Sequence, residues 1–136
     1  MRMRALVVGG TGPTGPYLVN GLLARGYATA IFHRGTHEID EIPRSVEHIH
    51  ADPYDAAALE AALAGRRFDV VVATYGRLRD VARACVGKTD RFVAVGGVPL
   101  YRGWMVPDDL VPRGLAVRCA KTLRWSRARP SSARAS

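Results

Sequence analysis

The 136-residue sequence has only two cysteines, Cys85 and Cys119, and their number and spacing exclude a disulfide framework and a cysteine-based metal site. Long apolar runs are also missing, since none approaches the roughly 18 residues that a membrane-spanning helix needs. The chain enters an apolar strand soon after Met1, too early for a signal peptide. These absences predict a cytoplasmic protein without a membrane partner, and the length fits one domain with a substantial core.

Acidic residues are scarce, with 12 Asp and Glu against 20 Lys and Arg, which gives a formal net charge of +8. The excess lies at the C-terminal end, because residues 1–112 hold 13 basic and 12 acidic residues, whereas residues 113–136 hold seven basic residues and no acidic one. Residues 118–136 are rich in Arg, Ser and Ala without helical or strand periodicity, which predicts a disordered tail. Nucleic-acid binding through this tail is one functional interpretation, and we rank it below the two that are given further on.

A cluster of glycines follows the apolar run at residues 5–8 and precedes a helical pattern of leucines. Strand, glycine turn and helix in this order are typical of a dinucleotide-binding site. In such a motif the first glycine, here Gly9, lets the strand turn, and the second, Gly12, lets the backbone lie against a pyrophosphate. The third, Gly15, lets helix and strand pack closely. A Walker A loop is excluded because no Lys-Ser or Lys-Thr pair follows the last glycine. The predicted cofactor-binding residues here are Gly9, Gly10, Thr11, Gly12, Pro13, Thr14 and Gly15.

Strand and helix patterns alternate up to residue 95. Apolar runs predict further strands at residues 28–33, 46–50, 69–73 and 91–95, and helical periodicity predicts helices from about residues 13–16 to 25, over 55–64 and over 78–87. Residues 34–43 have no clear period and are predicted to be a loop. Such βαβ units with right-handed crossovers give an α/β, Rossmann-like open parallel sheet with strand order 3-2-1-4-5. Its ligand crevice lies beyond the carboxyl ends of the strands.

Four segments resemble the N-terminal part of the NAD(P)-dependent epimerase/dehydratase family, which belongs to the extended or atypical short-chain dehydrogenases/reductases. They are VVGGTGPTG, ADPYDAAAL, VVVATYG and VAVGGVPLYRG, within residues 3–115. The resemblance implies a nicotinamide dinucleotide as ligand and, in a full-length relative, a nucleotide sugar or similar carbonyl or hydroxyl compound as substrate. It implies that Asp52 bonds the adenine amino group with Pro53 against the ring, and that Ala73, Thr74 and Tyr75 flank the ribose and the nicotinamide. A turn aspartate is the alternative for Asp52.

The end of the second predicted strand bears on the choice of cofactor. An NAD site calls for Asp or Glu about 20 residues beyond the glycines, where it accepts hydrogen bonds from the ribose hydroxyls. This sequence has His33 and Arg34 there, and the nearest carboxylate belongs to Glu38. Since a guanidinium holds a 2′-phosphate and a carboxylate repels it, Arg34 favours NADP over NAD. The alternative is a solvated loop arginine.

The catalytic signature of the resembled family, Tyr-x-x-x-Lys, is missing from this sequence. None of the five tyrosines is followed by lysine four residues later. Tyr75 and Arg79 come nearest, but arginine holds its proton too tightly to relay it. The sequence therefore predicts no catalytic residue, and two interpretations are open: the cofactor-binding part of an oxidoreductase or epimerase, and a non-catalytic module that senses NADPH.

The C-terminal residues suggest a reason for the missing signature. Written in GC-rich codons and read one base earlier, residues 118–125 encode Pro-Val-Arg-Glu-Asp-Ala-Pro-Leu, a string that suits a loop. We therefore hypothesise that the reading frame shifts near Val117. Residues 1–117 would then be an NAD(P)-binding domain truncated before its sixth strand and substrate region, and residues 118–136 a frameshift product. The fifth strand would be an exposed apolar edge prone to self-association.

His48 and His50 lie on one face of the third predicted strand and form a pair of candidate metal ligands. We expect no third ligand near them, so no metal site is predicted. Cys85 lies on the apolar stripe of its helix and is predicted to be a core residue.

Overall fold

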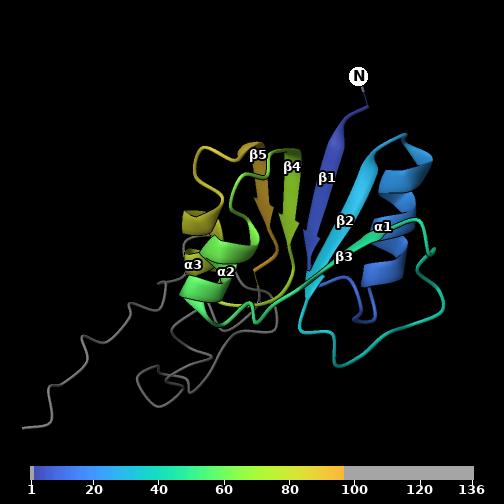
Figure 1. The fold of residues 1–136 in the computed structure, drawn as a ribbon. Coiled ribbons are helices and arrows are strands. Elements are labelled where there is room, and N and C mark those ends of the chain that lie inside the picture. Colours follow the sequence, from blue (N-terminus) through green and yellow to red (C-terminus); the bar gives the residue numbers. More distant parts are fainter. Residues whose placement is uncertain (1, 97–136) are drawn as a thin grey trace, which may run out of the picture. The chain divides into compact units, whose positions relative to one another are not determined.

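A computed structural model describes residues 2–96, which form a parallel five-stranded sheet flanked by helices (Figure 1). The strand order is β3-β2-β1-β4-β5, which confirms the predicted Rossmann-like topology. All four pairs of neighbouring strands are parallel. The elements in chain order are β1 (Arg4–Val8), α1 (Gly15–Ala24), β2 (Ala28–His33), β3 (Glu47–His50), α2 (Ala56–Ala62), β4 (Phe68–Ala73), α3 (Leu78–Ala84) and β5 (Thr89–Ala94).

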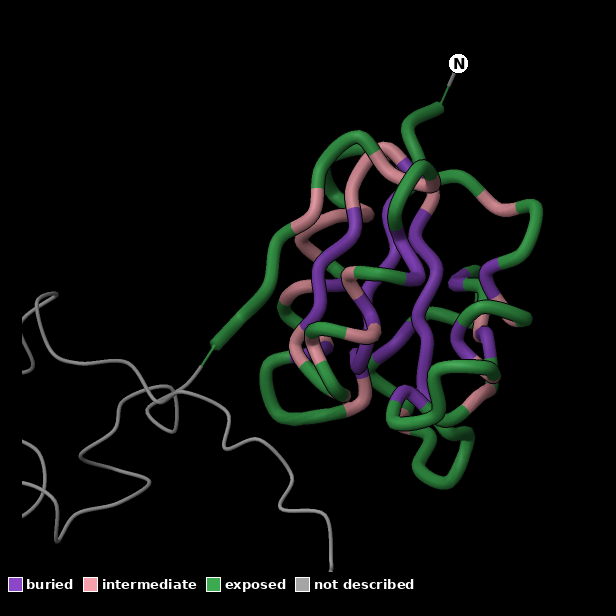
Figure 2. Tube along the Cα trace, turned by 90° about the vertical axis from the view of Figure 1, so that its left-hand side faces the viewer, coloured by how far each residue is buried: buried purple, intermediate pink, exposed green. Residues whose placement is uncertain are grey.

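The central strand β1 is buried beyond its first residue, and the buried strands run through the middle of the domain (Figure 2). Its side chains alternate between two apolar clusters. Leu6 packs in the cluster that contains Leu59 of α2 and Val81 of α3, whereas Val7 packs in the cluster that contains Val19 of α1. The sheet is thus covered on both faces, which explains why its central strands are continuous apolar runs.

A local signal in the sequence sets the start of α2 as predicted. The carboxylate of Asp55 caps α2 by accepting hydrogen bonds from the N–H groups of Ala57 and Ala58. Cys85 is a core residue, as predicted, with only 3% of its surface exposed. Its burial raises the pKa of the thiol. The fifth strand begins earlier than predicted, at Thr89, because it pairs with β4 from Phe68 onward.

The connection between β2 and β3, residues 34–46, is a loop rather than a helix, as its lack of periodicity predicts. Ile42 and Val46 are buried in the cluster on the α1 side of the sheet, and Ile39 packs against it. These contacts hold the loop against the sheet, so that its first residues lie near the carboxyl ends of β2 and β3.

The edge strand β5 pairs with β4 alone within residues 2–96. Val93 of this strand and Val95, which follows it, are 45% and 55% exposed. Self-association through this edge stays a prediction. In the same part of the chain, none of the helices has the length and apolarity that crossing a membrane requires. The predicted domain boundary at Val117, the basic tail of residues 118–136 and Cys119 lie outside the described residues.

Candidate dinucleotide-binding site

The turn after β1 is built from glycines because its backbone has positive φ angles, which residues with a side chain rarely adopt. Gly9 and Gly10 have φ angles of 111° and 99°. A Cβ on Gly9 would lie 2.5 Å from Thr74 Oγ1, and the Thr74 hydroxyl donates to the Val8 carbonyl at 3.1 Å. The glycine therefore lets the end of β4 close against the end of β1, and this contact forms one wall of the site.

Helix α1 begins directly after this turn, at Gly15, whose N–H donates to the Gly12 carbonyl at 2.9 Å. A Cβ on Gly15 would overlap the Gly10 carbonyl, so only glycine permits this approach of helix to strand. Within the described residues, the N-cap Thr14 makes no side-chain hydrogen bond to the helix, and the first turn holds no acidic residue. The positive end of the helix dipole is thus left available for an anion such as a pyrophosphate.

A cavity of about 370 Å³ opens at the carboxyl ends of β1, β2 and β4, in front of the start of α1. Most of the predicted site residues line it together: Gly9, Gly10, Thr11, Gly12, Pro13, Thr14, Gly15, Arg34, Thr74 and Tyr75. The remaining lining residues are His33, which the sequence places with Arg34 at the end of the second strand, and Thr36 and His37, which the sequence reasoning missed. Their position directly after β2, where a parallel sheet opens to its crevice, is the signal that could have found them.

Three predicted residues do not line this cavity within the described part of the chain: Asp52, Pro53 and Ala73. The Asp52 carboxylate accepts a hydrogen bond from the Tyr54 N–H at 2.9 Å, which is the turn role weighed above as its alternative. Pro53 is buried beside Gly76, where a Cβ would lie 2.9 Å from Pro53 Cβ, and Ala73 is in the core. Contacts of these three residues with adenine or ribose stay predictions.

Arg34 stands at the rim of the cavity with an exposed side chain. Its Nη2 donates to the Tyr75 hydroxyl at 3.1 Å, and its guanidinium lies 6.0 Å from the centroid of the Tyr75 ring. The Tyr75 ring in turn meets the Tyr54 ring edge-on, with 5.3 Å between centroids. These contacts hold the guanidinium at the end of β2, where the ribose of a bound dinucleotide is expected.

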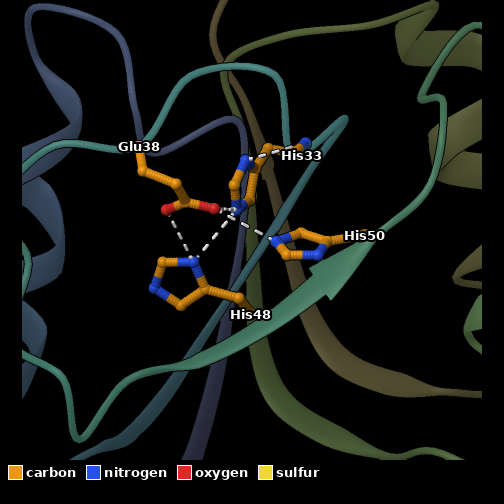
Figure 3. Close-up of polar contacts among 5 residues, drawn as sticks. His33, Glu38, His48 and His50 are labelled. Carbon is orange, nitrogen blue, oxygen red and sulfur yellow. Dashed lines mark hydrogen bonds and ion pairs between the residues drawn. The ribbon is translucent and has the colours of Figure 1, made fainter.

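A second group of polar side chains lies beside the cavity, where His33, Glu38, His48 and His50 converge (Figure 3). The expectation that no third ligand lies near His48 and His50 is wrong, because the loop after β2 folds Glu38 back onto β3. Burial lowers the pKa of His33, and the charges of His50 and His48 add to this effect while Glu38 opposes it. Burial would raise the pKa of Glu38, but the surrounding histidines together lower it.

Fold and site together define a Rossmann-type dinucleotide-binding domain. The chain belongs to the NAD(P)H-binding family, whose sequence profile matches residues 9–116. A search of curated protein sequences gave no match.

Solved structures confirm the fold, and two of those described here are named as epimerases. A nucleoside-diphosphate-sugar epimerase from Pseudomonas aeruginosa is 25% identical, with 74% of this chain and 35% of that one covered and a TM-score of 0.61. A putative epimerase from Burkholderia cenocepacia is 24% identical over 93% of this chain and 45% of that one, with a TM-score of 0.64. The Bordetella bronchiseptica enzyme WbmG, solved in complex with NAD, is 20% identical over 74% and 39%, with a TM-score of 0.61. This chain thus spans less than half the length of each.

Proposed function

We propose that this chain binds NADP in preference to NAD and serves as the cofactor-binding part of an epimerase or oxidoreductase acting on a nucleotide sugar or a similar carbonyl or hydroxyl compound. The observation that carries the choice of cofactor is Arg34 at the rim of the glycine-lined cavity. A guanidinium is suited to the 2′-phosphate of NADP, which it can bind through two parallel hydrogen bonds. The epimerases among the similar structures support the reaction class.

The proposal assigns cofactor binding, and no turnover, to this chain. Its tyrosines are not followed by the lysine that proton transfer in this family uses, so we expect binding of NADPH without oxidation in the presence of nucleotide sugars. Titration of the protein with NADPH and with NADH, followed by nicotinamide fluorescence, tests the cofactor assignment. Absence of saturable binding of both nucleotides would refute it.

Replacement of Arg34 by glutamate is expected to weaken NADPH binding by about ten- to hundredfold, because a charge-assisted hydrogen bond worth roughly 1.5–3 kcal/mol is lost. NADH has no 2′-phosphate, so its dissociation constant should change by less than about threefold, a shift within the range of surface substitutions. Calorimetric titration of the variant with each nucleotide measures both changes.

Arg44→Glu is the matched control, since Arg44 is an exposed arginine of the same loop and is not among the residues that line the cavity in the described part of the chain. This variant should bind both nucleotides as the wild type does. Equal losses of NADPH and NADH affinity in Arg34→Glu would show that Arg34 does not read the 2′-phosphate.

A further inference from the structure

Three imidazoles and one carboxylate meet beside the cofactor cavity, and the cavity does not account for them. Of the four, only His33 lines the cavity. His48 and His50 are two residues apart on β3, so their side chains point to the same face of the sheet. The register of the sheet places His33 of β2 opposite His50. All three histidines therefore leave the same face of the sheet. Glu38 comes from the loop above and points into the space between them (Figure 3).

We propose that Glu38, His48, His50 and His33 bind a divalent transition-metal ion with the coordination preferences of Zn²⁺. Imidazole nitrogen and carboxylate oxygen are ligands that zinc takes in tetrahedral sites. The proposal does not depend on the identity of the nicotinamide cofactor, because the four ligand atoms are held by the sheet and the loop.

Four of the spacings among the candidate ligand atoms are close to those around a single ion. Four atoms at about 2.0–2.1 Å from a tetrahedral zinc lie roughly 3.3 Å from one another. Glu38 Oε2 lies 3.0 Å from His48 Nδ1, and Glu38 Oε1 lies 3.2 Å from His50 Nε2. His33 Nε2 lies 3.1 Å from His48 Nδ1 and 3.6 Å from Glu38 Oε1. All the ligand atoms lie within 4.8 Å of one another.

Hydrogen bonds alone are a poor explanation for this convergence. A neutral imidazole carries one N–H, and His33 Nε2 and His48 Nδ1 face each other while both approach the same carboxylate. If both nitrogens donate to Glu38, two N–H groups are opposed at 3.1 Å; if one accepts, the carboxylate loses a donor. A cation at the centre takes one lone pair from the carboxylate and one from each facing nitrogen that carries no proton, which removes this conflict.

The four candidate ligands differ in whether the nitrogen that faces the cluster carries a proton. The Gly35 N–H donates to His33 Nδ1 at 3.2 Å, which leaves the proton of the neutral ring on Nε2, the atom that faces the cluster. Binding of the ion through His33 therefore requires this proton to move to Nδ1 and the bond from Gly35 to break. Glu38, His48 and His50 form the core of the site, and His33 completes the shell at that cost.

The geometry indicates a structural clamp rather than a catalytic metal, because four protein ligands leave no position for substrate. Glu38 is the ligand from the loop, so the ion would fasten residues 34–46 to the sheet. The side chains of Glu38 and His50 are 50% and 52% exposed, which gives an ion access from solvent.

The test uses the full chain without a histidine tag, treated with chelator and then titrated with Co²⁺ and Zn²⁺. We expect uptake of one equivalent, the visible absorption of four-coordinate Co²⁺, its displacement by Zn²⁺, and a higher melting temperature with Zn²⁺. Glu38→Gln and His48→Gln should each lower metal affinity by about tenfold or more, since even outer-shell changes cost that much. His33→Gln should cost less.

Two variants of neighbouring residues of the same types serve as controls, namely Glu41→Gln and His37→Gln, and both should bind metal as the wild type does. Circular dichroism of the metal-free proteins checks that each variant is folded. If Glu38→Gln does not fold, His48→Gln and the wild-type stoichiometry decide the outcome. Uptake without saturation at one equivalent, or equal affinity in the cluster variants and their controls, would overturn the proposal.

Discussion

Replacement of Gly15 by alanine is expected to destabilise the domain by about 3 kcal/mol or more, at the upper end of the cost of overpacking. The added Cβ would overlap the carbonyl of Gly10, a backbone group that cannot rotate away as a flexible side chain does. Relief requires α1 to move away from the turn after β1, which separates Val19 from the apolar cluster around Val7. Total stabilities of domains are about 5–15 kcal/mol, so a large share would be lost. Urea unfolding followed by circular dichroism measures the change.

The matched control is the same substitution six residues further along the same helix. In the described structure, a Cβ on Gly21 meets one atom beyond its chain neighbours and the backbone of its own helix. This atom is Arg25 Nη1, at 3.5 Å, which lies at the end of a flexible side chain. Gly21→Ala should therefore raise the free energy of unfolding by about 0.5–1 kcal/mol, the usual gain in a helix interior. If Gly15→Ala unfolded at the urea concentration of the wild type, the close contact of helix and turn would be disproved.

The sequence predicts the sheet well because its signals are local. The apolar run of residues 69–73 indicates a strand whatever the rest of the chain does, and Asp55 marks a helix start through bonds to its nearest neighbours. The strand order then follows from short crossover connections. The glycine turn is predictable for the same reason, since strand, turn and helix are contiguous in the sequence.

The histidine cluster escaped prediction because it depends on the path of an aperiodic loop. His48 and His50 are separated by one residue, but Glu38 reaches them only after residues 34–46 fold back against the sheet, with Ile42 as a buried anchor. No periodicity in that loop indicates its path. The position of Asp52 is likewise a matter of tertiary geometry, because the same Asp-Pro pair suits a turn or a contact with adenine.

Gly12→Leu is expected to abolish dinucleotide binding while leaving the fold intact. Gly12 lines the cavity, and apart from its two chain neighbours no described residue has an atom within 4 Å of the position that its Cβ would take. Its φ is not in the left-handed region, so a larger residue fits the backbone without strain. The leucine side chain would instead fill the space that a pyrophosphate needs against the backbone. We expect NADPH affinity to fall at least about hundredfold, equivalent to roughly 2.7 kcal/mol.

Gly15 is thus needed for the fold, whereas Gly12 is needed for the ligand. A comparison of their variants separates the effect on folding from the effect on binding. The free energy of unfolding of Gly12→Leu should stay within about 0.5 kcal/mol of the wild type, as for a surface substitution. Gly12→Ala, which adds one methyl group, should cost an intermediate share of the affinity, and Gly21→Ala should cost none. Urea unfolding and NADPH titration of the same preparations measure both quantities. Wild-type NADPH affinity in a folded Gly12→Leu would place the pyrophosphate elsewhere than at the start of α1, and would remove the cavity from the cofactor site.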